Sequence, residues 1–310
     1  MKCYGLRLRL LAVVSMICIF ALPAIGRADT FSVLNDGIGV APGTNMPNDV
    51  YSTSPDGAHL FDTPLDGTNT VALTPADLGL SAADEIDALS FGFDSADPAS
   101  IYDVYFSVDA NSQGASGTDV AWKASTSRQM GTLFDANPGQ LAGVNFADTY
   151  GEDYGLNDSA YGQNNDDLDA VDLGAAPYVP GQDGDVYFSL AGDGNIYLNS
   201  LGNIFRTAAS LGIEQGQDLD ALAIDAVTGD VLFSLASASG YGSAADLFLN
   251  NTSNVAITAA DLGLLSSDNL NALTTTAMVP EPSSLVFLAT GLFGLLGLRR
   301  RAGGKGGHHV

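Results

Sequence analysis

The stretch QDLDALAIDAVTGDVLFSL, residues 217–235, decides the fold because both of its ends recur elsewhere in the chain. Its first six residues form a core phrase with Asp or Asn in fourth place and Ala in fifth, and the copies are Asp84–Leu89, Asp166–Val171, Gln217–Leu222 and Asp268–Leu273. Its last five residues form a Phe-Ser phrase, which follows the first three copies at Val104–Val108, Val186–Leu190 and Val231–Leu235. The fourth copy lacks this sequel, but Phe31-Ser32-Val33 near the N-terminus matches it. The chain therefore contains an internal repeat.

Two further elements accompany the core phrase. A third short phrase, with Asp or Asn in second place, precedes each copy at Asn48–Tyr51, Thr118–Ala121, Gly194–Tyr197 and Ala245–Phe248. A Leu-Gly element stands nearer to the core phrase, at Leu78–Leu80, Leu211–Ile213 and Leu262–Leu264, with a weaker echo at Tyr154–Leu156. Short β-type runs separated by Gly, Asp and Asn turns predict an all-β protein.

The spacing of the copies gives the size of the unit. Successive core phrases, counted from position 87 to 169, 220 and 271, lie 82, 51 and 51 residues apart. A unit of about 50 residues with four strands is the size of a propeller blade, so the sequence predicts four blades. The longer interval predicts an insertion over residues 136–165, which are rich in Gly, Asn, Asp and Tyr, or alternatively a degenerate fifth blade.

The displaced Phe-Ser copy at the N-terminus distinguishes closed from open arrangements. In a ring, this strand would complete the last blade and protect edges that would otherwise pair with other chains. A linear solenoid gains nothing from the displacement, and a β-sandwich needs no such regular units. We therefore predict a closed β-propeller-like domain over residues 29–278.

The N-terminus has the three parts of a secretory signal peptide. Lys2, Arg7 and Arg9 precede an apolar run, and small residues end at Ala28, where we place the cleavage. Residues 1–28 would therefore be removed by signal peptidase. Both cysteines of the chain lie in this segment, so the mature protein is expected to contain no thiol, disulfide or cysteine metal site.

The C-terminus combines a motif, an apolar stretch and a basic tail. Pro280-Glu281-Pro282 precedes residues 283–298, which as a transmembrane helix would be about 24 Å long. Arg299-Arg300-Arg301 follow, and the positive-inside rule places them in the cytoplasm.

This C-terminal arrangement over residues 279–310 resembles the PEP-CTERM sorting signal of Gram-negative bacteria. The resemblance implies that an exosortase in the inner membrane recognises Pro280, Glu281 and Pro282 and cleaves nearby. It further implies an exported protein with a transient inner-membrane intermediate, released to the cell envelope or an extracellular polysaccharide matrix. The tail gives a location and no activity.

Four polar residues occupy the fourth place of the core phrase, namely Asp87, Asp169, Asp220 and Asn271. A closed ring would gather them around one axis, where their oxygens could bind a hard cation such as Ca²⁺. The alternative is a structural latch, in which each Asp accepts hydrogen bonds from its own turn. Apart from this Ca²⁺, the sequence indicates no cofactor.

The charge distribution limits the function classes. The net charge is −25, but residues 29–281 hold 3 of the 11 basic residues and all 36 acidic ones, a net of −33. Such a body repels phosphate backbones, which excludes a nucleic-acid partner. No nucleophile or metal-protease motif is present, and His59 is the one histidine of the body. We therefore predict a non-enzymatic surface or matrix protein, with exopolysaccharide as one partner; the alternative is a secreted polysaccharide hydrolase using paired Asp residues.

Overall fold

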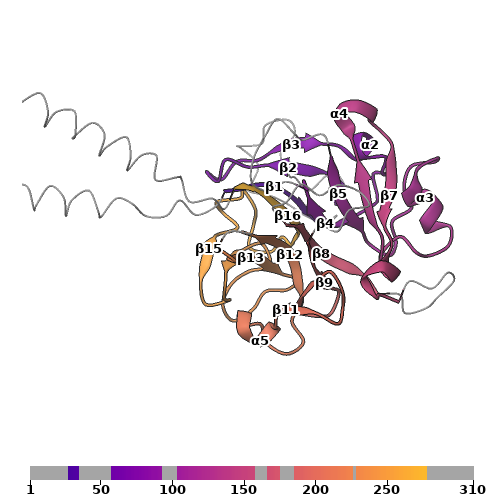
Figure 1. The fold of residues 1–310 in the computed structure, drawn as a ribbon. Coiled ribbons are helices and arrows are strands. Elements are labelled where there is room, and N and C mark those ends of the chain that lie inside the picture. The colour runs from indigo at the N-terminus through magenta and orange to yellow at the C-terminus, as the bar shows by residue number, and fades with distance from the viewer. Residues whose placement is uncertain are drawn as a thin grey trace, which may run out of the picture. The chain divides into compact units, whose positions relative to one another are not determined.

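The computed structural model describes residues 27–34, 57–92, 103–157, 166–174, 185–225 and 228–277. These residues belong to one compact unit, residues 26–278. They form four separate four-stranded antiparallel sheets in a propeller-like arrangement (Figure 1), which confirms the all-β prediction and the number of four blades. Each sheet is open, and no fifth blade occurs among these residues.

Each blade is one sheet, and its four strands are named below in their spatial order, from the innermost strand to the outermost. Blade 1 consists of β16 (Leu270–Ala277), β1 (Arg27–Val33), β2 (Leu60–Asp62) and β3 (Thr70–Leu73). Blade 2 consists of β4 (Ile86–Ser90), β5 (Val104–Val108), β6 (Leu133–Ala136) and β7 (Asn145–Thr149). Blade 3 consists of β8 (Leu168–Leu173), β9 (Val186–Leu190), β10 (Ile196–Leu198) and β11 (Ile204–Arg206). Blade 4 consists of β12 (Leu219–Ile224), β13 (Val231–Leu235), β14 (Leu247–Leu249) and β15 (Val255–Ile257).

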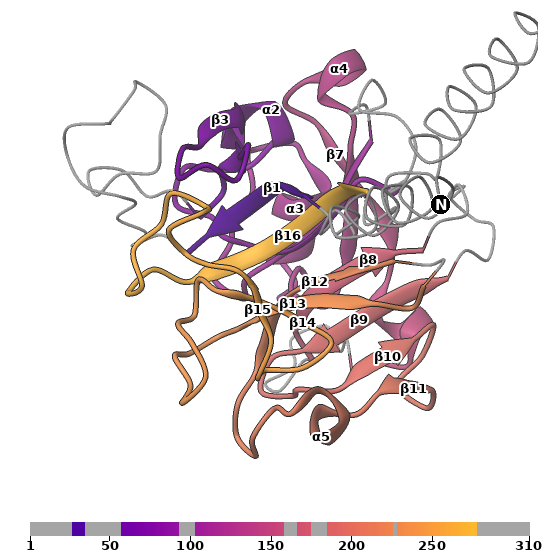
Figure 2. The ribbon, with the colours of Figure 1, turned by 90° about the vertical axis from the view of Figure 1, so that its left-hand side faces the viewer.

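The core phrases form the innermost strands, and the Phe-Ser phrases form the strands next to them. Each of β4, β8, β12 and β16 contacts the innermost strands of both neighbouring blades. β1 pairs with β16, with Phe31 opposite Leu273 and Ser32 opposite Ala272. Figure 2 shows the two strands side by side, although they come from opposite ends of the body. The predicted exchange of the N-terminal strand into the last repeat is confirmed.

Four serines link the blades in a circular series. In every blade, the Oγ of the serine on the second strand donates to the carbonyl of the first residue of the innermost strand in the following blade. The bonds are Ser32 to Ile86 at 3.0 Å, Ser107 to Leu168 at 2.6 Å, Ser189 to Leu219 at 3.0 Å and Ser234 to Leu270 at 3.0 Å. All four serines are fully buried. A buried hydroxyl requires a partner, so these bonds fix the position of each blade against the next.

Each blade also has its own aromatic pair between the second and third strands. The pairs are Phe31–Phe61, Phe106–Phe134, Phe188–Tyr197 and Phe233–Phe248, with ring centroids 5.5 to 5.8 Å apart. The six phenylalanines among the second and third strands of blades 1, 2 and 4 are fully buried. The buried side chains of the described residues form four hydrophobic clusters, and each cluster combines residues of two neighbouring blades.

The Leu-Gly elements are ends of short helical turns and not β-runs. α2 (Pro75–Leu78), η2 (Gly151–Tyr154) and α5 (Ala208–Leu211) end at Gly79, Gly155 and Gly212, with φ of 71°, 78° and 72°. Gly263 has φ 72° in the corresponding turn of blade 4. Glycine is favoured because this left-handed cap costs other residues free energy. The echo at Tyr154–Leu156 is therefore a full member of the series.

Blade 2 corrects two expectations. The phrase at Thr118–Ala121 is not a strand: it starts the helix α3 (Asp119–Ala124), where the Thr118 side chain accepts from the backbone N–H of Ala121. Its counterparts at 194–197 and 245–248 do contribute to β10 and β14, while residues 48–51 lie outside the described part. The expected insertion over 136–165 contains the ordinary strand β7 and the short helix α4 (Pro138–Leu141), and much of the extra length lies between β5 and β6.

No helix within the described ranges is long and apolar enough to cross a membrane. The predicted signal peptide, apart from its last two residues at the start of β1, and the predicted transmembrane helix over 283–298 fall outside those ranges.

Candidate functional site

The structure places the four fourth-place residues of the core phrase at the same point of each innermost strand. Asp87, Asp169, Asp220 and Asn271 are each the second residue of β4, β8, β12 and β16, and each is at most 8% exposed. Asn271 Nδ2 donates to Asp87 Oδ1 and to the carbonyl of Ile86, both at 2.9 Å. These four residues therefore lie near the same end of the four innermost strands, which pack against one another.

The turn preceding each innermost strand is held by a different residue, the first of the core phrase. Asp84 accepts from the backbone N–H of Ser81 at 2.7 Å, and Asp268 accepts from that of Leu265 at 2.8 Å. Gln217 likewise accepts from Glu214 at 3.1 Å, whereas Asp166 accepts from Asn157, nine residues earlier, at 2.7 Å. Latching the turn and lining the axis are therefore tasks of separate positions.

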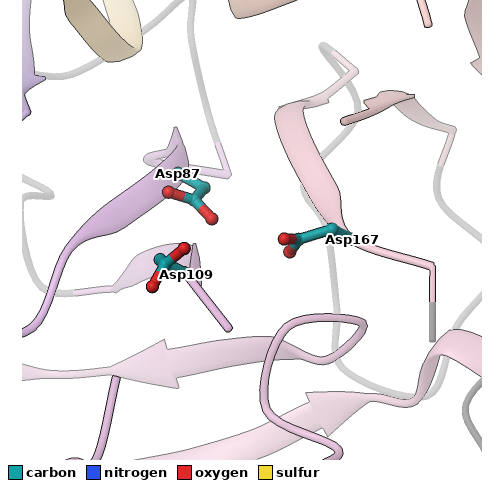
Figure 3. A group of neighbouring side chains, drawn as sticks. All are labelled: Asp87, Asp109 and Asp167. Carbon is teal, nitrogen blue, oxygen red and sulfur yellow. The ribbon is translucent and has the colours of Figure 1, made fainter. Parts of the chain in front are cut away.

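Two further aspartates extend the group where blades 2 and 3 meet. Asp109 follows β5 and Asp167 precedes β8. One carboxylate oxygen from each of Asp87, Asp109 and Asp167 lies within 4.8 Å of the other two. Figure 3 shows the carboxylates of Asp87 and Asp167 directed toward each other, with Asp109 beside them. We call Asp87, Asp109, Asp167, Asp169 and Asp220 the axial cluster.

Asp109 breaks the fourfold equivalence. Its N–H donates to the carbonyl of Glu85 at 3.2 Å, and the matching donors in the other blades are Leu34, Ala191 and Ala236. Blade 2 thus carries a carboxylate where the other blades carry an apolar side chain. The sequence contains a signal for this residue, because it directly follows the Phe-Ser phrase, but the prediction of four axial residues did not include it. Asp167 was likewise missed, although it is the second residue of a core phrase.

Burial and mutual repulsion raise the pKa values of four members of the cluster, namely Asp87, Asp167, Asp169 and Asp220. Burial is the main cause for each shifted group. It raises the pKa of Asp220 to about 8 and that of Asp167 to about 7. The pKa values of Asp87 and Asp169 lie well above the usual range, because these groups are buried and further carboxylates lie close to them. Without a counterion, the cluster therefore retains protons near neutral pH.

Several oxygens of the cluster have no hydrogen-bond partner. Asp167 Oδ1, Asp169 Oδ2 and Asp220 Oδ2 are buried in this state. The neighbouring Asp218 differs, since its two oxygens accept from the backbone N–H groups of Gly192 at 2.7 Å and Asp193 at 3.0 Å. Unsatisfied buried acceptors are costly, so the cluster has coordination capacity that the protein itself leaves unused.

The structure does not describe the predicted residues of the sorting motif and the basic tail, which are Pro280, Glu281, Pro282, Arg299, Arg300 and Arg301. His59 stacks on Phe61 with ring centroids 6.0 Å apart, and burial lowers the pKa of its imidazole, so it is neutral at pH 7.

Comparisons with known proteins locate the recognisable part of the chain. No curated protein matches the sequence. Among solved structures, the extracellular domain of a protein described as a putative one-component system from B. thetaiotaomicron is 14% identical, with a TM-score of 0.26. A second structure of that domain, described as a putative hybrid two-component system, is 12% identical, with a TM-score of 0.25. The alignments cover 81% and 76% of this chain but only 30% and 27% of those chains. The family model of the PEP-CTERM protein-sorting motif matches residues 279–301, and the chain therefore carries this sorting motif at its C-terminus.

Proposed function

We propose that this protein is exported, sorted by an exosortase and delivered to the cell surface or the extracellular matrix. The PEP-CTERM motif at residues 279–301 carries this proposal. In it, signal peptidase removes residues 1–28, the helix over 283–298 holds the chain in the inner membrane, and Arg299 to Arg301 stay in the cytoplasm. The exosortase then acts at Pro280-Glu281-Pro282, and the body leaves the membrane.

The body, in this proposal, is a closed β-propeller with a non-catalytic binding or structural role, and exopolysaccharide is a candidate partner. The β1–β16 pairing and the circular series of serine hydrogen bonds support the closed ring. The repetition of buried aspartates at the start of the innermost strands supports a structural origin for these particular acidic residues. A rigid body of this kind presents surface loops from fixed positions.

One observation favours a secreted polysaccharide hydrolase as a second candidate. Oxygens of Asp87 and Asp167 lie within 4.8 Å, near the roughly 5 Å separation of the two carboxyl groups in retaining glycosidases. The pKa of Asp167, raised to about 7 by burial, suits a general acid. Asp87 is buried and Asp167 is partly buried, which restricts the access of a substrate and is the reason for preferring the non-catalytic role.

The sorting proposal is tested by expression in a host with an exosortase and in the same host lacking it. We expect wild type to lose its C-terminal tail and to appear in the envelope or medium only when the exosortase is present. A Pro280→Ala, Glu281→Ala, Pro282→Ala variant should remain uncut in the membrane fraction. A Ser283→Ala, Ser284→Ala variant is the matched control and should be processed normally. Equal processing of all three proteins, or processing without the exosortase, would contradict the proposal.

The hydrolase candidate is tested on the same exported protein. Incubation with exopolysaccharide from the host should release no new reducing ends. If wild type did release reducing ends, Asp167→Asn abolished this release and the exposed-site variant Glu214→Gln kept it, the protein would be a hydrolase and not a non-catalytic protein.

A further inference from the structure

We propose that the axial cluster binds one Ca²⁺ ion where blades 2 and 3 meet, with Asp87, Asp109 and Asp167 as the nearest ligands and Asp169 and Asp220 completing the acidic lining. This inference rests on the geometry of the body and holds for either function proposed above.

The oxygen positions fit a calcium ion. Ca²⁺ binds oxygen at about 2.3–2.6 Å, so two of its ligand oxygens are separated by at most about 5 Å. One oxygen from each of Asp87, Asp109 and Asp167 meets this condition with respect to both others, at 4.8 Å or less. The three carboxylates lie around a common point, and Figure 3 shows those of Asp87 and Asp167 directed toward each other.

The hydrogen bonds of the ligands leave one oxygen of each available. Asp87 accepts from Asn271 with Oδ1, and Asp109 accepts from the N–H of Asn111 with Oδ1 at 2.6 Å. These bonds fix the orientation of both carboxylates without occupying their second oxygens. Such outer contacts are the usual means of orienting metal ligands.

The second, independent observation is the set of buried oxygens that have no partner. Asp169 and Asp220 are 8% and 4% exposed, and their Oδ2 atoms, like Asp167 Oδ1, have no hydrogen bond. The charges that act most strongly on Asp169 are those of Asp220, Asp218, Asp87 and Asp167, so its carboxylate lies close to three members of the cluster. Buried carboxylates without partners are stable only when they are protonated or bind a cation.

The ligand chemistry selects calcium among common divalent ions. The cluster consists of carboxylate oxygens, the donors of hard cations, and it contains no imidazole or thiolate of the kind that zinc prefers. Ligands from separate blades form an irregular group, which Ca²⁺ accepts and Mg²⁺, with its strict octahedron, disfavours. The affinity expected for an extracellular site is in the range of about 10⁻⁴ to 10⁻³ M.

The repeats themselves supply the test variants. Asp109→Ala introduces the residue found at the equivalent positions 191 and 236, and Asp167→Asn introduces the residue found at the equivalent position 269. Both substitutions already occur in this fold at matching places, so both variants should fold. Glu214→Gln removes one charge from an exposed side chain and is the control.

The experiment uses the exported protein, stripped with EDTA, and measures calorimetric titration and thermal unfolding with CaCl₂ or MgCl₂ at pH 7.5. Wild type and Glu214→Gln should bind one Ca²⁺ and gain about 5 °C or more in Tm at saturating CaCl₂, with a smaller response to MgCl₂. Asp109→Ala and Asp167→Asn should bind at least about tenfold more weakly, while in EDTA their Tm should equal or exceed that of wild type because repulsion is relieved. The highest CaCl₂ concentration is about 10 mM, ten times the weakest expected dissociation constant. The proposal would be overturned if this concentration left the wild-type Tm unchanged. It would also be overturned if CaCl₂ and MgCl₂ gave equal responses, or if both variants bound Ca²⁺ as tightly as wild type.

Discussion

Blade 2 and blade 4 make the same internal contacts with very different lengths of chain. Ser107 and Ser234 each donate to the next innermost strand, and the aromatic pairs Phe106–Phe134 and Phe233–Phe248 have centroid distances of 5.8 and 5.7 Å. Blade 2 nevertheless spans residues 86–149, whereas blade 4 spans 219–257. The comparison teaches that the inner strands are held by repeated contacts, while chain can be added in the connections between strands, above all between the second and third.

The two blades differ most in their acidic residues. Asp109 of blade 2 corresponds to Ala236 of blade 4, as their matching backbone hydrogen bonds show. On the third strand, Asp135 of blade 2 occupies the position of Leu249 in blade 4. Asp135 pairs with Tyr105, and Leu249 pairs with the equivalent residue Leu232. The additions to blade 2 therefore include carboxylates in partly buried positions.

The aromatic pairs should make the largest and most equal contributions. Phe106→Ala and Phe233→Ala should each lower the free energy of unfolding by about 3–5 kcal/mol, because each leaves a cavity at a fully buried site. Denaturant unfolding measures the loss. Phe146→Ala and Tyr241→Ala, at exposed positions of the two regions, are the controls. A cost below about 1 kcal/mol in one blade only would end the equivalence of the blades.

The serine hydrogen bonds should come next. Ser107→Ala and Ser234→Ala should each cost about 1–2 kcal/mol, because a buried carbonyl loses a donor. Equilibrium unfolding of both variants can be compared with the exposed control Ser266→Ala, which should change stability little. If both serine variants matched the control, the serines would not hold the blades together.

The helix α3 tests whether the addition in blade 2 is independent of the inner strands. Thr118 accepts from the N–H of Ala121 at 3.4 Å and donates to the carbonyl of Ala115 at 2.7 Å. Thr118→Ala should cost about 1 kcal/mol, the usual value of an N-cap, and should leave the denaturant m-value unchanged. Hydrogen exchange should show faster opening in residues 119–124 than in β4. Equal acceleration in both would mean that α3 and the inner strands belong to one cooperative unit.

Asp135 should have the smallest effect, and one of opposite sign. Burial, followed by the charges of Asp103 and Asp148, raises the pKa of Asp135 to about 6, and its Oδ1 has no hydrogen-bond partner. A raised folded-state pKa means that the folded protein binds the proton more tightly than the unfolded chain, so stability is lost as the pH rises from about 4 to about 6.

Asp135→Asn should therefore stabilise the protein by about 1 kcal/mol at pH 7, less than the shift alone implies because water screens this half-buried group. The gain should vanish near pH 4, where the carboxyl group is protonated in the folded protein. Thermal unfolding at both pH values measures it, and Asp153→Asn, at an exposed position, is the control. A gain of equal size at the lower pH would exclude the carboxylate charge as the cause.

The sequence was sufficient to predict the repeated strands, because similar phrases make equivalent contacts in each blade. The core phrases, the Phe-Ser phrases and the displaced copy at Phe31-Ser32-Val33 all form the predicted strands. The helix at Thr118 was not predictable from the phrase alone, since Asp-Val-Ala suits both a strand and the first turn after an N-cap.

The candidate site was predictable only where it follows the repeat. Fourfold equivalence predicted that Asp87, Asp169, Asp220 and Asn271 occupy equivalent positions, and the structure places them at the same point of each innermost strand. The proximity of Asp109 and Asp167 depends on the antiparallel register of β4 with β5 and on the packing of blade 2 against blade 3. Neither the register nor the packing can be derived from spacing alone.

The pairing of β1 with β16 has a consequence for the timing of folding. β1 is the first of these strands to be synthesised and β16 is the last, so blade 1 lacks its innermost strand until nearly the whole body has been made. Strand pairing between the ends of a chain is slow because a long loop must close first. β16 ends at Ala277 and the PEP-CTERM motif starts at residue 279, so a chain that presents its complete motif has also just acquired the strand that completes its first blade.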